Sequence, residues 1–173
     1  MKIILLFLCL SIPSALLAQN SLVASQQALV GTRIDSLAMT GFLLNEPAEK
    51  DFSRKFKVIE FWATWCRPCL AAVPHLNKLQ EKFRDSNIVF LSVTDEKPKQ
   101  TEETFRKVKF ETIVASDTTR RTHRALRIDH NGTMVLPRTV LVDNENRIIW
   151  YGSPLKLTEK LIRRFLAGEL TAE

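Results

Sequence analysis

The pattern of hydrophobic and polar residues predicts secondary structure most clearly in the first half of the chain. The apolar, β-prone run at 58–62 is interrupted only by Glu60 and predicts a buried strand at 57–62. From 67 to 83, apolar residues recur at spacings of three and four, which predicts a helix with one buried face. A second apolar run at 87–93 predicts a parallel strand. The pattern therefore predicts a β-α-β unit.

Shorter elements are predicted on both sides of this unit. Apolar positions around Gly41 predict a short strand pair at 31–44, packed on the edge of the domain. Downstream, we expect a charged helix at 101–109, a small strand at 113–115 and a helix at 117–126 that is capped by Ser116 or Asp117. A β-hairpin at 139–151 and a final helix at 158–167 should follow. Thr158 is the expected N-cap of the final helix. This order of elements predicts an α/β fold.

The beginning of the chain has the pattern of an export signal. A basic start is followed by an apolar run and then by small residues, so we expect a signal peptide at 1–18. A flexible lead-in at 19–30 and a folded domain at 31–173 should follow. The alternative is an uncleaved anchor, although 3–18 is shorter than the ~20 apolar residues that span a bilayer. Either way, the expected location is the periplasm or another extracytoplasmic space.

Composition and charge narrow the class of protein further. With 173 residues, 45% of them hydrophobic, the chain suits one compact domain behind its signal. The formal charge of +6 is modest, and the basic residues are scattered. Small basic clusters such as 120–121 and 163–164 are typical of solvated helix faces, so no nucleic-acid partner is expected.

The cysteines carry the chemistry that the sequence suggests. Removal of the signal leaves only Cys66 and Cys69. A ring this small constrains little of the unfolded chain, so a redox-active pair is favoured over a structural disulfide. Cys66 falls at the predicted strand-to-helix turn, where the helix dipole and Arg67 favour a thiolate. The alternative of another class is a Cu(I)- or Zn-binding module, although a closed zinc site needs four ligands.

The segment Phe61-Trp62-Ala63-Thr64-Trp65-Cys66-Arg67-Pro68-Cys69, with Pro74 five residues later, resembles the active site of thioredoxin-fold thiol-disulfide oxidoreductases. The closer resemblance is to the exported TlpA-like branch, and it covers 31–168. It implies a thioredoxin fold, with a central mixed β-sheet flanked by helices and a short N-terminal β extension. It also implies an enzyme in which Cys66 is the nucleophile and Cys69 the resolving cysteine. Neither a cofactor nor a metal is expected.

The same resemblance assigns roles outside the cysteine pair. Pro137 matches a proline that is cis in this class and lies against the cysteines, and Leu136 would offer backbone hydrogen bonds to an extended substrate. Glu60 matches a buried acid that transfers protons to and from Cys69, and an acid inside an apolar strand needs such a reason. The remaining expected substrate contacts are Trp65, Arg67 and Pro68.

The resemblance finally indicates a direction of reaction. Arg67-Pro68 is similar to the dipeptide of reducing members, so we expect reduction of disulfides in extracytoplasmic proteins, with apocytochromes as one candidate substrate. A membrane thiol shuttle would supply the electrons. A disulfide-donating oxidase or isomerase is the alternative. Arg138 departs from the class, whose members more often carry a threonine after the proline.

Overall fold

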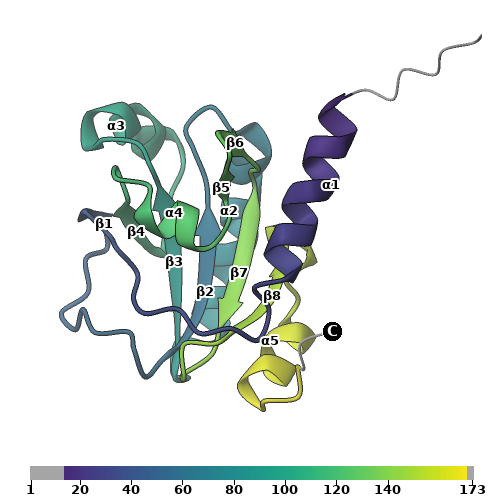
Figure 1. Cartoon of the computed structure of the whole chain (residues 1–173). Helices are drawn as coiled ribbons and strands as arrows, with labels where there is room; N and C mark the ends of the chain where they lie inside the picture. Colours follow the sequence, from purple (N-terminus) through teal and green to yellow (C-terminus); the bar gives the residue numbers. More distant parts are fainter. Residues whose placement is uncertain (1–13, 171–173) are drawn as a thin grey trace, which may run out of the picture.

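A six-stranded mixed sheet forms the centre of the protein, with helices on both of its faces (Figure 1). Its strands follow the order β1-β4-β3-β2-β7-β8, in which β2, β3 and β4 run parallel and the other pairings are antiparallel. Their bounds are β1 Gly41–Leu44, β2 Phe56–Phe61, β3 Ile88–Thr94, β4 Ile113–Ser116, β7 Arg138–Val142 and β8 Ile148–Gly152. The expected α/β thioredoxin fold is confirmed.

The computed structural model describes residues 14–170, with side chains from Ser21 onward. The predicted signal peptide at 1–18 lies largely outside these residues, so its cleavage stays a prediction. Within 14–170, no helix combines the length and the apolar character that crossing a bilayer requires.

Two apolar layers cover the two faces of the sheet. Because side chains of a strand point alternately to opposite faces, Val58 faces α2 (Arg67–Lys82) and α5 (Glu159–Leu166), whereas Ile59 and Phe61 face the other side. That other side is covered by residues that follow α4 (Arg121–Ala125) and by 29–39. The smaller elements are α3 (Pro98–Lys107), β5 (Asp129–His130), β6 (Thr133–Met134) and η1 (Pro154–Lys156).

The N-terminal segment differs from its expectation. The stretch 19–30 was expected to be a flexible lead-in, but α1 (Ser14–Gln27) is helical and lies beside β7 and β8 (Figure 1). The Leu22 side chain is 1% exposed, and Gln26 Nε2 donates to the Arg127 carbonyl oxygen at 2.8 Å. The expectation was wrong because this order depends on tertiary contacts that a polar local sequence does not reveal.

Most of the remaining expectations are confirmed with shifts at their ends, and two are wrong in part. The β-α-β unit is β2, α2 and β3, and Thr158 caps α5 by accepting a hydrogen bond from the Leu161 N–H. The expected strand pair at 31–44 was wrong in part, because only β1 and an isolated bridge between Arg33 and Arg147 form. The helix predicted at 117–126 is the shorter α4, since Arg120 adopts a left-handed conformation before it.

Candidate active site

The cysteine pair lies where β2 gives way to α2. Cys66 is the N-cap residue of α2, Cys69 lies in the first turn, and the two form a disulfide with Cα atoms 5.3 Å apart. The Cys66 N–H donates to the Ala63 carbonyl oxygen at 3.0 Å, which closes the turn after β2. Cys66 is 3% exposed and Cys69 1%, so both cysteines are buried. The expected strand-to-helix placement of the pair is confirmed.

Aromatic side chains surround the pair on the α2 side of the sheet. Trp62 belongs to the same buried cluster as Cys66 and Cys69, and its ring packs against Phe110 with centroids 4.8 Å apart. Trp65, by contrast, is 66% exposed. It is therefore available to a partner at the edge of the disulfide, as are the exposed side chains of Arg67 and Pro68.

The local electrostatics favour a thiolate at Cys66 once the disulfide is reduced. The first N–H groups of a helix have no acceptor within the helix, and the macrodipole places a partial positive charge there. No acidic residue occupies the first turn of α2, and Arg67 adds a cation. Pro68, which has no N–H to satisfy, suits this turn. Such features are typical of a reactive cysteine, and the assignment of the nucleophile to Cys66 remains a prediction.

The loop before β7 meets the cysteine cluster. The Leu136-Pro137 peptide bond is cis, as the resemblance implied for Pro137. Leu136 packs against the cluster that contains both cysteines. Arg138, the first residue of β7, pairs with Phe61 at the end of β2, which places the loop at the same end of the sheet as Cys66. Contacts from Leu136, Trp65, Arg67 and Pro68 to a substrate remain predictions.

Glu60 is buried on the α2 side of β2. Its side chain is 3% exposed, and it shares a face with Val58 and Trp62 because both lie two residues away. The Thr139 hydroxyl donates to Glu60 Oε2 at 2.6 Å, while Oε1 has no hydrogen-bond partner within the described residues. Burial raises the pKa of Glu60 to about 8, against a smaller opposing effect of the Thr139 hydrogen bond.

The residue that follows Glu60 contacts the second cysteine through its backbone. Cys69 Sγ lies 4.0 Å from the carbonyl oxygen of Phe61, the residue after Glu60. A carboxyl with a pKa near 8 is matched to a thiol whose ordinary pKa is about 8.5, so proton transfer between two such groups would have little driving force either way. The arrangement is chemically suited to the role expected of Glu60, which itself remains a prediction.

Glu96 was missed by the sequence reasoning. It follows β3, is 8% exposed, and accepts two hydrogen bonds from Thr64, through Oε2 from the backbone N–H at 2.8 Å and through Oε1 from the hydroxyl at 2.6 Å. Thr64 stands two residues before Cys66. Its position in the sequence was a usable signal. An acidic residue just past the carboxyl end of a parallel strand lies at the end of the sheet where binding and active sites of α/β proteins form.

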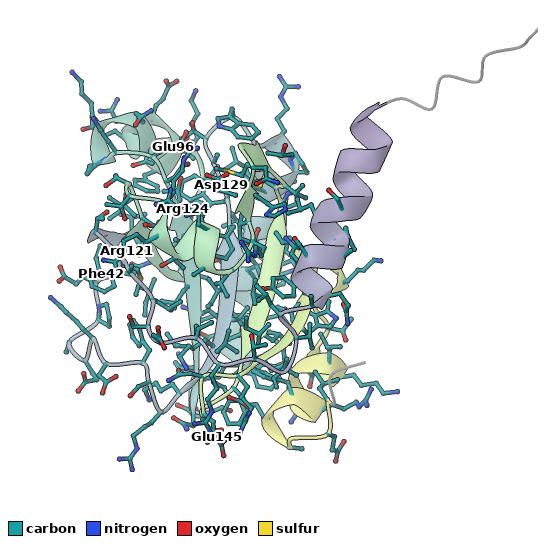
Figure 2. The ribbon with its side chains drawn as sticks, viewed as in Figure 1. Phe42, Glu96, Arg121, Arg124, Asp129 and Glu145 are labelled. Carbon is teal, nitrogen blue, oxygen red and sulfur yellow. A yellow bond between two sulfur atoms is a disulfide. The ribbon has the colours of Figure 1, made fainter. Side chains whose placement is uncertain are left out.

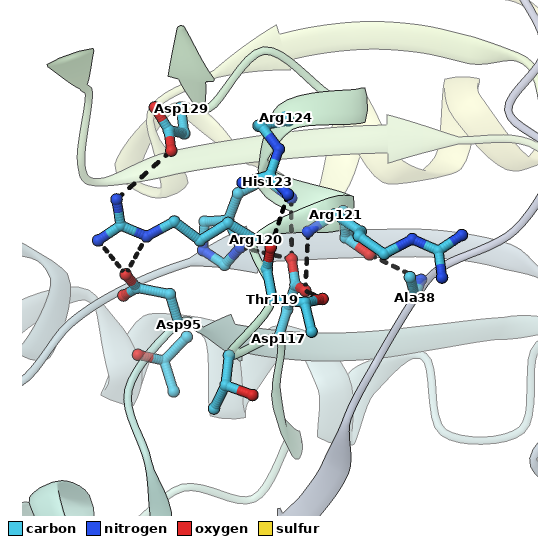
Figure 3. Close-up of polar contacts among 12 residues, drawn as sticks. Ala38, Asp95, Asp117, Thr119, Arg120, Arg121, His123, Arg124 and Asp129 are labelled. Atoms are coloured by element: carbon cyan, nitrogen blue, oxygen red, sulfur yellow. Dashed lines mark hydrogen bonds and ion pairs between the residues drawn. The ribbon is translucent and has the colours of Figure 1, made fainter. Parts of the chain in front are cut away.

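A set of ion pairs holds the segment that carries Glu96. Arg120 contacts Asp95 at 2.6 Å and Asp129 at 3.4 Å, and so joins the end of β3 to the start of β5 (Figure 3). Figure 2 places Glu96 and Asp129 at one end of the molecule and Glu145 at the other. Nearby, Asp117 accepts from the backbone N–H of both Arg121 and His123. The active-site end is therefore cross-linked by polar contacts between separate loops.

A metal centre was the alternative of another class. Among residues 21–170, no group of three or more His, Cys, Asp or Glu side chains is arranged to hold a metal ion. The two cysteines instead bond to each other.

Comparison with known proteins places this site in a family. The sequence profile described as the AhpC/TSA family matches residues 30–151, which is more than half of the chain. The chain therefore belongs to the AhpC/TSA family of thioredoxin-like proteins, and its class is that of the thiol-disulfide oxidoreductases.

Individual relatives agree with this class. The chain is similar to the thiol-disulfide oxidoreductase ResA of Bacillus thuringiensis subsp. konkukian, with 25% identity over 148 residues, 85% of this chain and 82% of that one. The match to ResA of Bacillus cereus strain ATCC 10987 is shorter, with 27% identity over 101 residues that cover 58% of this chain and 56% of that one.

Solved structures share the fold. A candidate thiol-disulfide oxidoreductase from Bacteroides vulgatus superposes with a TM-score of 0.56 at 26% identity, over 67% of this chain and 79% of that one. PrxQ from Xylella fastidiosa superposes with a TM-score of 0.61 at 17% identity, over 83% and 97% of the two chains. At this identity the second similarity concerns the fold alone.

Proposed function

We propose that this protein reduces disulfides of extracytoplasmic proteins through a cycle between the Cys66-Cys69 dithiol and its disulfide. One observation carries the proposal: Cys66 caps α2 and is bonded to Cys69 beside the Leu136-Pro137 loop, with the buried acid Glu60 on the strand that leads to the pair. This combination provides a nucleophile, a resolving thiol and a proton acceptor at one end of the sheet.

The first step is attack by Cys66. The Cys66 thiolate displaces one sulfur of the substrate disulfide, which forms a mixed disulfide and releases one substrate thiolate. The N-terminus of α2 stabilises the attacking thiolate by its free N–H groups and dipole. Cys69 lies inside the first helical turn and not at the N-cap, so we assign the attack to Cys66.

The second step returns the enzyme to its disulfide. The Cys69 thiol loses its proton to the Glu60 carboxylate and attacks Cys66 Sγ, which releases the second substrate thiolate. Two electrons thereby pass from the Cys66-Cys69 dithiol to the substrate disulfide, which becomes two thiols. A dithiol donor must then reduce the pair again, and a membrane thiol shuttle is the donor that we propose.

Substrate binding is assigned to the surface around the pair. A peptide in extended conformation can hydrogen-bond to the backbone of Leu136, with the same kind of backbone hydrogen bonds that β-strand addition makes at sheet edges. The exposed ring of Trp65 supplies apolar contact next to the sulfur atoms, and Arg67 and Pro68 complete the rim.

The location and the substrates rest on the export signal predicted at 1–18 and on the relatives named as thiol-disulfide oxidoreductases. We place the protein in the periplasm or another extracytoplasmic space. Cysteines of apocytochromes, which must be reduced before haem attachment, are one candidate substrate.

Trapping of the mixed disulfide tests the proposal. With the reduced protein and insulin as substrate, Cys69→Ser should accumulate a covalent complex that dithiothreitol releases, and Cys66→Ser should form none. Turnover should fall to background in both variants. A trapped complex in Cys66→Ser alone would assign the nucleophile to Cys69, and turnover of insulin without either cysteine would contradict the cycle.

Two parallel assays test the direction and the chemistry. If the oxidised protein converts a reduced, unfolded substrate to its disulfide form faster than the reduced protein reduces insulin, disulfide donation is the function instead. If hydrogen peroxide is consumed faster than any protein disulfide, the protein is a thiol peroxidase.

A further inference from the structure

Arg138 is a cation without an acceptor beside the loop of the cysteine site. It follows Pro137 directly, and its side chain is half-buried. Within residues 21–170, its buried Nε has no hydrogen-bond partner and no carboxylate lies in ion-pair range of its guanidinium. Arg120 shows the contrast, because its guanidinium contacts Asp95 and Asp129.

The side chain of Arg138 lies on the face of the sheet opposite Glu60. Successive residues of a strand alternate between faces, so Arg138 points away from the side on which Thr139 meets Glu60. The guanidinium stands over the Tyr151 ring, with Cζ 5.7 Å from its centroid. The Tyr151 hydroxyl donates to the Leu126 carbonyl oxygen, so the ring is held in place as a platform.

Leu136, two residues before Arg138, connects this cation to the cysteine pair. Leu136 packs both against the cluster containing the cysteines and against the cluster on the far face that includes Phe61 and Tyr151. A peptide that pairs with the backbone of Leu136 would therefore lie beside the cysteine cluster, two residues along the chain from Arg138.

The surroundings of Arg138 are energetically unusual. A guanidinium carries five N–H donors and stays charged, so withdrawing it from water without an acceptor is unfavourable. Burial lowers the pKa of Arg138, and this shift reflects the cost of removing the guanidinium from water. The electrostatic effect of Tyr151 on this pKa is opposite and smaller. Such a penalty is expected where a ligand completes the interaction.

We infer that Arg138 is a specificity-determining residue that binds a carboxylate of the substrate, the side chain of an Asp or Glu next to the cysteine that Cys66 attacks. The inference rests on the proposed function and names its substrate class: disulfides flanked by acidic residues. Guanidinium and carboxylate pair through two parallel hydrogen bonds, which fixes orientation as well as affinity.

The test compares three amidated peptides that contain the same disulfide and differ only in having Asp, Asn or Lys beside the cysteine. Amidation removes the terminal carboxylate, so only the side chain can supply the negative charge. The wild-type protein should reduce the Asp peptide with the lowest KM. Arg138→Met should raise that KM by roughly 10-fold, with kcat for the Asn peptide unchanged, because a charge-assisted pair is lost before chemistry begins.

Further variants separate recognition from a structural role. Arg54→Met removes the same charge from an exposed site at the start of β2, at the opposite end of the sheet, and should leave all three KM values unchanged. Arg138→Lys should restore part of the preference for Asp, and Arg138→Glu should transfer the preference to the Lys peptide. If Arg138→Glu does not fold, the Met and Lys variants decide.

The outcomes also separate this inference from the function on which it rests. Equal KM values for the three peptides in the wild-type protein, or an equal loss for all three in Arg138→Met, would overturn the role of Arg138 and leave disulfide reduction intact. Failure of the wild-type protein to reduce any of the peptides or insulin would overturn both.

Discussion

Glu96 binds Thr64 through both of its carboxylate oxygens, accepting the backbone N–H at 2.8 Å and the hydroxyl at 2.6 Å. Thr64 belongs to the turn that positions Cys66, whereas Glu96 belongs to the loop after β3. The position of Cys66 therefore depends on the loop that follows the neighbouring strand β3. The neighbouring Asp95 is held in turn by Arg120, so the support extends across the end of the sheet.

Replacing Glu96 should disturb the active-site turn. In Glu96→Gln the amide oxygen can still accept from the Thr64 N–H, and the Thr64 hydroxyl must turn to accept from the amide N–H, so both bonds lose their carboxylate acceptor and become weaker neutral bonds. We expect a loss of about 1–3 kcal/mol in the free energy of unfolding and a shifted reduction potential of the Cys66-Cys69 pair. Urea unfolding and equilibration with glutathione buffers measure the two effects.

Two other variants control this prediction. Glu103→Gln makes the same change on the exposed surface of α3 and should affect neither quantity. Thr64→Val removes only the hydroxyl and should produce a smaller shift of potential than Glu96→Gln. An unchanged potential in Glu96→Gln, despite lower stability, would show that Glu96 supports the fold without positioning the cysteines.

Glu60 should set the pH dependence of the resolving step. With a pKa of about 8, its carboxylate form increases as the pH rises through 8, so resolution of the mixed disulfide should accelerate over this range. Glu60→Gln should slow this step by about 10- to 100-fold at pH 8 and leave only the dependence due to thiol ionisation. Stopped-flow measurement of the released substrate thiol follows the step, and identical profiles for the two proteins would refute the assignment.

The same residue should make stability fall with rising pH. Because the pKa of Glu60 is raised from 4.5 to about 8 in the folded state, the folded protein binds the extra proton more tightly than the unfolded chain. Its contribution is therefore fully present below pH 4.5 and is lost as the pH rises to 8. Glu60→Gln should remove this loss, so its stability relative to wild type should increase by a few kcal/mol between pH 5 and 8.

Lys57 should change the pH dependence of stability in the opposite direction. Burial lowers its pKa to about 8 from 10.5, so its effect is opposite: stability rises with pH between 8 and 10.5. Taking the difference between wild type and Glu60→Gln cancels this contribution. If that difference is constant from pH 5 to 8, Glu60 does not titrate in this range.

The docking of α1 should contribute measurably to stability. Leu22 is almost fully buried, so Leu22→Ala should destabilise the protein by about 2–5 kcal/mol in urea unfolding. Val23 is 48% exposed on the same helix, and Val23→Ala should have little effect. Equal effects of the two substitutions would contradict the packing of α1 against the domain.

The sequence predicted those features whose signals are local. The cysteine pair and its strand-to-helix turn lie within a few residues, and Glu60 is conspicuous because an acid interrupts an apolar strand. The bond from Glu96 to Thr64 joins residues 32 positions apart, and each residue is ordinary in its own segment. The contact of α1 with Arg127 spans 101 positions. Such contacts arise only when the chain folds, so local patterns did not reveal them.

The reduction potential of the Cys66-Cys69 pair tests the central claim most directly. The protein should be equilibrated with dithiothreitol or glutathione buffers of known potential, and its free thiols counted. A reductase should give a value near the −270 mV that is typical of thioredoxin, about −250 mV or lower. A value near about −120 mV, as in strong oxidants, would contradict the proposed direction and make disulfide donation the function.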